Sequence, residues 1–153
     1  MLRKSVALLV ALVAVLAIPL AADGASKKTV KFTNLTVKVR LIETIGENAV
    51  YAGTIAPGPL GPGSTVVRTT GANPDGSVNV RGTAFFAKGT LQIKFSDTVT
   101  VQPDGSATFD ATDGRITGGT GAYKGASGKF TFKGTAPNPD ATQTHKLNGK
   151  FSY

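Results

Sequence analysis

The segment from Gly114 to Phe130, GRITGGTGAYKGASGKF, carries six glycines among residues that favour β-strands. Glycine adopts backbone angles that other residues avoid, and it allows two backbones to approach closely because it has no β-carbon. The spacing predicts sharp turns or bends in this segment, followed by a strand through Phe130. The glycines therefore have a structural role before any chemical one.

Apolar residues after Lys28 follow a period of two in almost every segment, and none sustains the spacing of a helix. This pattern predicts a nearly all-β domain. In the first strand the apolar parity changes between Phe32 and Leu35, which predicts a β-bulge near Thr33 and Asn34. The expected strands are residues 29–43, 49–55, 65–70, 77–87, 90–95, 97–101, 107–111, 128–133 and 145–153, and some neighbouring pairs are open to merging into one bent strand.

The breaks between these strands contain residues suited to turns. Asn73–Gly76 and Gln102–Gly105 both place proline and aspartate before a glycine, which predicts two tight hairpins. The Pro57–Gly63 segment is longer and carries three prolines and three glycines. It is compatible with a lid over an opening and with a plain solvent-exposed connection.

Eight or nine short strands without a helix are compatible with a sandwich or a closed barrel. The segment from Ile116 to Gly128 is similar to the glycine motif of the allene oxide cyclase and dirigent families, and to bacterial secreted proteins with that barrel. The resemblance covers about a tenth of the chain. It implies an eight-stranded, possibly nine-stranded, antiparallel β-barrel of calycin-like shape, with an apolar cavity and a homotrimeric or homodimeric assembly.

The first residues have the layout of a secretory signal peptide: Arg3 and Lys4, an apolar run from Val6 to Leu20, then small residues. The run is short for a membrane span, which needs about 20 apolar residues. We expect a signal peptide over residues 1–22, a polar leader over 23–28 and the barrel domain over 29–153. An uncleaved N-terminal anchor is the alternative. Cleavage predicts a protein that is extracellular or held in the cell envelope, with no membrane contact afterwards.

The chain has a formal charge of +8, and removal of residues 1–22 leaves 15 basic and 9 acidic residues. Many lysines sit one residue away from apolar positions, as around Phe130 and Phe151, so they are expected on the outer face of half-buried strands. Basic residues interleaved with exposed aromatics, as single-strand binding requires, are not evident. We therefore expect no nucleic-acid partner.

Motifs for conventional catalysis are missing from the sequence. The glycine segment departs from both nucleotide-binding patterns and is followed by a strand, where those motifs need a helix. His145 is the single histidine and cysteine is absent, so neither a zinc site nor a catalytic triad is indicated, and His145 is expected at the surface. Aspartates such as Asp97 fall mainly at expected strand ends and turns. No cofactor, metal or catalytic residue is predicted.

Aromatic residues offer the best indication of a binding site. They are expected to line an apolar barrel cavity, with Glu43 or Arg68 supplying polar contacts. An eight-stranded barrel is wide enough to be filled by side chains or to hold one small ligand, and both remain open. The expected cavity aromatics are Tyr51, Phe85, Phe86, Phe95, Phe109, Phe130, Phe132 and Phe151, and the expected ligand-binding set is Glu43, Tyr51, Arg68, Phe95 and Phe109.

Two functional hypotheses follow. The first is a non-enzymatic barrel that binds a small apolar ligand or serves as an envelope scaffold. The alternative, implied by the resemblance, is an isomerase or cyclase that steers a reactive apolar substrate within the cavity with help from one carboxylate, for which Glu43 is the candidate.

Overall fold

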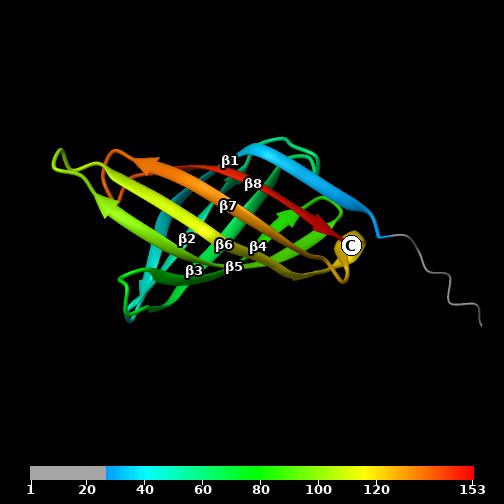
Figure 1. The fold of residues 1–153 in the computed structure, drawn as a ribbon, viewed down its shortest axis with the longest axis horizontal. Helices are drawn as coiled ribbons and strands as arrows, with labels where there is room; N and C mark the ends of the chain where they lie inside the picture. The colour runs from blue at the N-terminus through cyan, green and yellow to red at the C-terminus, as the bar shows by residue number, and fades with distance from the viewer. Residues whose placement is uncertain (1–26) are drawn as a thin grey trace, which may run out of the picture.

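The computed structural model describes residues 27–153, which form one closed barrel of eight antiparallel strands (Figure 1). Each strand pairs with the next in sequence, and the last strand pairs with the first, so the structure is a barrel and not a sandwich. This confirms the expected fold class. The elements are β1 (Thr29–Ile45), β2 (Asn48–Ile55), β3 (Gly63–Ala72), β4 (Val78–Phe86), β5 (Gly89–Val101), β6 (Ala107–Gly119), the short 3-10 helix η1 (Gly121–Tyr123), β7 (Ser127–Ala136) and β8 (Gln143–Ser152).

The expected signal peptide and most of the polar leader lie outside the described residues. Within residues 27–153, no helix has the length and apolar character needed to cross a membrane.

The predicted bulge in the first strand is confirmed. The register between β1 and β8 shifts between Phe32 and Leu35, and Asn34 has a positive φ of 53°. The side-chain oxygen of Asn148 accepts a hydrogen bond from the Asn34 backbone N–H at 2.9 Å. The bulge returns Leu35 and the alternate residues after it to the interior, where Val37 and Val39 are buried.

The expected strands differ from the structure most clearly at β5 and β6. Residues 90–95 and 97–101, a pair that the sequence left open to merging, form one continuous strand, β5. The strand end expected at residue 111 was wrong, because β6 extends from Ala107 through the first glycines of the motif to Gly119. The β5–β6 register shifts between Lys94 and Thr98, so the chain bends there without leaving the sheet. Of the expected eight or nine strands, the structure has eight.

The rest of the glycine motif closes one end of the barrel. Gly121 begins η1 with a φ of 58°, which suits glycine, and the backbone N–H of Ala122 donates to the carbonyl of Lys88 at 2.9 Å. This contact ties the β6–β7 connection to the β4–β5 turn. The motif thus has the structural role that its glycines predicted.

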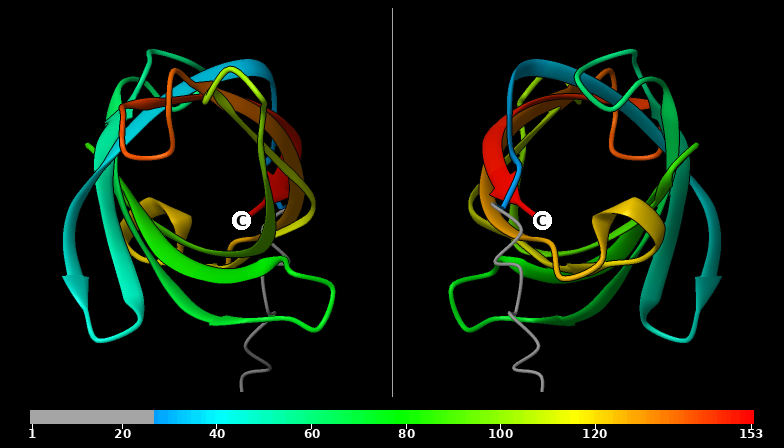
Figure 2. Two further views of the ribbon diagram at one scale, coloured as in Figure 1. Left: turned by 90° about the vertical axis from the view of Figure 1, so that its left-hand side faces the viewer. Right: turned by 90° about the vertical axis from the view of Figure 1, so that its right-hand side faces the viewer.

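The barrel has two distinct ends, visible when it is viewed along its axis (Figure 2). The turns β1–β2, β3–β4, β5–β6 and β7–β8 lie at one end, called the hairpin end below. The start of β1, the C-terminus, the β4–β5 turn and η1 lie at the other, the terminal end (Figure 1). The β2–β3 loop lies on the terminal side of its two strands.

The sheet closes with a large stagger. One circuit of the barrel starts at Lys31 on β1 and passes from each residue to its direct partner on the neighbouring strand. It returns to β1 at Glu43, twelve residues further along the chain. Closing a barrel with such a stagger requires the strands to tilt relative to its axis. A row of neighbouring residues therefore descends from the terminal end toward the hairpin end as it passes around the barrel.

Candidate ligand cavity

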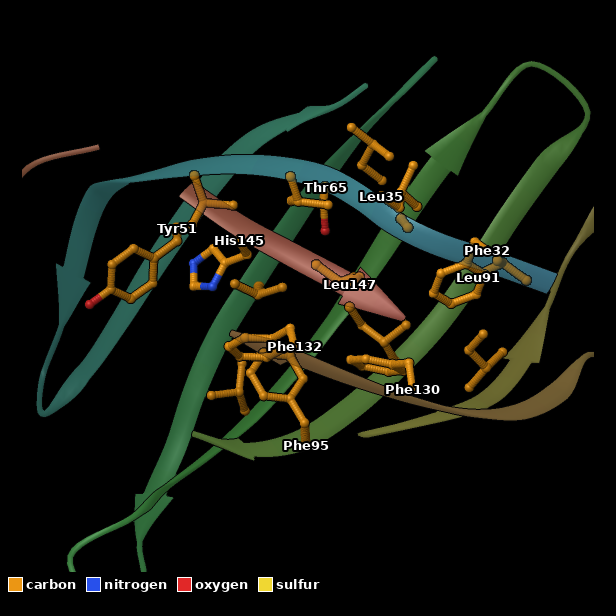
Figure 3. A pocket seen from close by; sticks show the side chains of 18 of the residues that line it. Phe32, Leu35, Tyr51, Thr65, Leu91, Phe95, Phe130, Phe132, His145 and Leu147 are labelled. Carbon is orange, nitrogen blue, oxygen red and sulfur yellow. The ribbon is translucent and has the colours of Figure 1, made fainter. Parts of the chain in front are cut away.

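The interior of the barrel contains a cavity of about 180 Å³. Its lining comes from all eight strands and the β2–β3 loop, and consists mainly of Val, Leu, Ile and Phe side chains (Figure 3). A dry apolar cavity of about 150 Å³ is large enough to bind benzene or xenon. The barrel is therefore partly hollow, and its space suits a molecule of about one ring.

The expected cavity aromatics are almost all in the lining. Tyr51, Phe95 and Phe109 of the predicted ligand-binding set line the cavity, as do Phe86, Phe130, Phe132 and Phe151. Phe85 is the exception, because it is 43% exposed on the outer face of β4. Figure 3 shows Phe95, Phe130 and Phe132 grouped along one side of the cavity.

Glu43 and Arg68 are exposed and do not line the cavity, so the interior positions expected for them were wrong. A second bulge in β1, between Leu41 and Glu43, changes the parity and places Glu43 opposite Val50. Arg68 lies between Val67 and Thr69, which both line the cavity, and alternation therefore directs Arg68 outward.

His145 is a lining residue that sequence reasoning placed at the surface. It is buried, with 6% of its surface exposed, and the edges and faces of Phe132 and Phe109 surround its ring at centroid distances of 4.8 and 5.5 Å. Burial lowers the pKa of His145 to about 4, so the ring is neutral at pH 7. The signal was available, because His145 shares the parity of Leu147 and Phe151 on β8.

The His145 ring is held by two neighbours. Its Nε2 lies 3.1 Å from the side-chain oxygen of buried Gln143, two residues earlier on the same strand. Gly134 lies directly opposite on β7, and a β-carbon there would fall 2.3 Å from His145 Nδ1. Gly134 therefore provides the space that the imidazole occupies. Nδ1 is buried and has no hydrogen-bond partner among the described residues.

Asp97 is the acidic residue of the cavity lining. It continues the inward parity of Ile93 and Phe95 on β5, which sequence reasoning missed by ending a strand beside it. Burial raises the pKa of Asp97 to about 7, the nearby Asp110 carboxylate adds to the shift, and a backbone hydrogen bond from Asp110 opposes it. Its Oδ1 is buried and has no partner in the described part of the chain.

Tyr51 lies on the same side of the cavity as His145 (Figure 3). Burial raises the pKa of the Tyr51 hydroxyl, the Asp97 carboxylate raises it further, and the Gln143 side chain lowers it. The influence of both residues places Tyr51, Asp97 and Gln143 in one neighbourhood. These three residues and His145 are called the polar group below. The cavity therefore has an apolar body and a small polar region.

The Pro57–Gly63 segment contributes to the cavity wall. Gly58, Pro59, Leu60 and Gly61 line it, and Leu60 packs against the core. This contact is compatible with the predicted lid and does not suit a purely solvent-exposed connection. The segment is thus part of the enclosure of the cavity.

The terminal end is closed by an aromatic plug, formed by Phe86, Tyr123, Phe151 and Tyr153. Tyr123 of η1 is only 2% exposed, and its ring meets those of Phe86, Phe151 and Tyr153 edge to face at centroid distances of 5.2–6.3 Å. Edge-to-face packing is a favoured aromatic arrangement. The glycine motif therefore delivers the residue that seals this end.

No group of three or more His, Cys, Asp or Glu side chains within residues 27–153 is placed to hold a metal ion. A search of family models, curated proteins and solved structures found no match to this chain.

Proposed function

We propose that the protein is an exported barrel that binds a small, largely apolar molecule in its interior. The cavity of about 180 Å³, lined by apolar side chains from every strand, carries this proposal. Pockets for drug-sized ligands occupy about 300–1,000 Å³, so the expected ligand is smaller and about the size of one ring or a short chain. The glycine motif's resemblance to the allene oxide cyclase and dirigent families supports the same proposal.

Two neighbouring residues on β3 allow a matched test. Val67 is buried and lines the cavity, whereas Val66 is 41% exposed on the outer face. Toluene binding is measured by ligand-detected NMR for the wild type, Val67→Phe and Val66→Phe, with thermal unfolding to confirm that each variant is folded. We expect Val67→Phe to weaken binding at least tenfold and Val66→Phe to leave it unchanged. Equal binding by both folded variants, or no binding by the wild type, would contradict the proposal.

Native mass spectrometry of the exported protein would detect a co-purifying natural ligand and measure the assembly state. A co-purifying molecule of one-ring size would identify the ligand class. The resemblance also supports a proposed homotrimer or homodimer, and sedimentation that shows only monomer at micromolar concentration would exclude that assembly.

A second candidate function is an isomerase or cyclase reaction, for which Asp97 provides a specific reason. A carboxyl group with a pKa near 7 is suited to exchange protons at neutral pH, and Asp97 lies in the cavity wall where Glu43 does not. In the test, a reactive epoxide of the allene oxide type is supplied and the stereochemistry of its cyclised product is compared with and without protein. Asp97→Asn is expected to abolish any stereochemical bias, and Glu43→Gln to preserve it.

A further inference from the structure

Seven basic side chains form a continuous row on the outside of the barrel, which we call the cationic row. All seven are exposed, and each lies directly opposite the next on the neighbouring strand. The row follows β1, β8, β7, β6, β5, β4 and β3 around the barrel. Its members are, in this order, Lys31, Lys150, Lys129, Arg115, Lys94, Arg81 and Arg68.

This arrangement is unfavourable for the isolated barrel. Like charges directly opposite each other on neighbouring strands are destabilising. The row contains six such pairs in succession, and it contains no acidic residue to offset them. The one ion pair within residues 27–153 joins Lys133 to Asp110 at 3.9 Å, outside the row. The cationic row is therefore a surface on which stability is not optimised.

A nearby row on the same strands shows that mixed charges are possible in this barrel. There, Lys146 lies opposite Lys133, and Lys133 lies opposite Asp110. All of the acidic residues described by the structure lie on the hairpin side of the cationic row or in the hairpin turns: Glu43, Glu47, Asp75, Asp97, Asp104, Asp110, Asp113 and Asp140. The separation of charge leaves the cationic row available to an anion.

The centre of the row lies at a shallow, open depression of the surface. Lys94, Arg115 and Lys129, on the adjacent strands β5, β6 and β7 (Figure 1), border a surface depression together with the hydroxyl residues Thr117 and Ser127. Ammonium, guanidinium and hydroxyl groups are hydrogen-bond donors suited to carboxylate and phosphate oxygens. The depression therefore presents several hydrogen-bond donors to one side, a suitable arrangement for one anionic group of a longer chain.

We propose that the cationic row binds a flexible, linear anionic polysaccharide whose carboxylate or phosphate groups follow the outer wall of the barrel. Neighbouring strands lie about 4.8 Å apart, so seven strands present a path of roughly 29 Å. The path is convex because it passes around a barrel, which suits a flexible chain. This surface is separate from the interior cavity, and its role does not depend on the proposed cavity ligand.

The shape and composition of the row disfavour other polyanions. Duplex DNA is stiff over about 150 base pairs and does not follow a convex path of this size. Single-stranded nucleic acid binds through aromatic stacking, and Phe85 is the single aromatic among the exposed large hydrophobic residues described. A flat anionic membrane meets one side of a convex barrel and leaves the two ends of the row without contact.

The test compares variants with the same change in net charge. The row variant is Lys94→Glu/Arg115→Glu/Lys129→Glu, and the control is Lys38→Glu/Lys88→Glu/Lys124→Glu, whose three positions are also exposed but lie outside the row. Binding of alginate, a carboxylate polymer, and of a glycosylated teichoic acid, a phosphodiester-linked polymer, is measured at several salt concentrations, with neutral dextran as a blank. We expect the row variant to weaken binding more than tenfold and the control less than threefold. An equal loss of binding in both variants would show that binding depends on net charge alone, and would overturn the proposal.

Substitutions at the two ends of the row test whether the bound polymer follows its whole length. Lys31→Glu/Lys150→Glu and Arg68→Glu/Arg81→Glu are each expected to weaken polysaccharide binding at least threefold, because a chain that follows the row contacts both ends. Loss at one end only, or tighter binding to duplex DNA or to phosphatidylglycerol vesicles than to both polysaccharides, would contradict the proposal. A preference for one of the two polysaccharides identifies the anionic group. Thermal unfolding checks that every variant is folded.

Discussion

The two ends of the barrel interior are built from the same strands but differ in chemistry. At the terminal end, Tyr123 and its aromatic neighbours form a plug without an ionisable carboxyl or imidazole group. Toward the hairpin end, Asp97 and His145 line the same cavity. Burial raises the pKa of Asp97 and lowers the pKa of His145, so it favours the neutral form of each side chain. The energetics of the terminal end are therefore those of aromatic packing, and the energetics of the polar end are those of keeping Asp97 and His145 uncharged.

This difference separates an end of the cavity that contributes stability from an end that costs stability. The plug closes the terminal end and contributes apolar burial, whereas polar groups that are buried without a hydrogen-bond partner cost stability. His145 Nδ1 and Asp97 Oδ1 are both buried without partners among the described residues. A polar atom of the proposed ligand would give either atom a hydrogen-bond partner.

The largest effect is expected from removal of the plug. Tyr123→Ala deletes a buried ring and leaves Phe86, Phe151 and Tyr153 without their shared contact, which should lower the free energy of unfolding by about 3–5 kcal/mol. Urea unfolding measures this change. Tyr123→Phe is the matched control, because it keeps the ring and should cost about 1 kcal/mol or less. Similar losses in both variants would show that the hydroxyl, and not the ring, closes the terminal end.

The sequence predicted the aromatic lining of the cavity better than its polar residues, for a physical reason. Alternation of side chains is local, so strands, the first bulge and most cavity aromatics followed from period two. The position of Glu43 depended on a second bulge between Leu41 and Glu43, where the apolar pattern gave no matching change. The inward position of Asp97 depended on β5 continuing unbroken, whereas that of His145 could have been inferred from the parity of Leu147 and Phe151 on β8. The second bulge and the continuity of β5 arise from pairing between distant strands, which a single strand's residues do not encode.

The second prediction compares the pH dependence contributed by Asp97 and His145. Asp97 has a pKa of about 7 when folded against 3.8 for the free side chain, so the folded state retains a proton and stability falls as pH rises from about 4 to 7. His145 has a pKa of about 4 when folded against 6.5 for the free side chain, so stability rises as pH increases from about 4 to 6.5. The two contributions oppose each other in the same window.

Removing one group should therefore reveal the other. Between pH 4 and 6.5, the free energy of unfolding of Asp97→Asn should rise with pH by at most about 3 kcal/mol, and that of His145→Leu should fall by a similar amount. The wild type should change much less over this range. Urea unfolding at half-unit pH steps measures all three curves. Parallel curves in the three proteins would show that the polar end does not titrate in this way.

The smallest effects come from one identical substitution made at each end. Gly119 lies beside the plug, and a β-carbon there would fall 2.4 Å from the carbonyl oxygen of Tyr123, so Gly119→Ala should cost about 2 kcal/mol through displaced backbone. Gly105 lies in the β5–β6 turn with a φ of 84° and open space around its β-carbon position, so Gly105→Ala should cost about 1 kcal/mol from backbone conformation alone. Thermal unfolding ranks the two variants. A larger loss of stability at Gly105 would show that the β5–β6 turn is more constrained than the contact of η1 with β5 and β6. The terminal end would then not be the more tightly packed end.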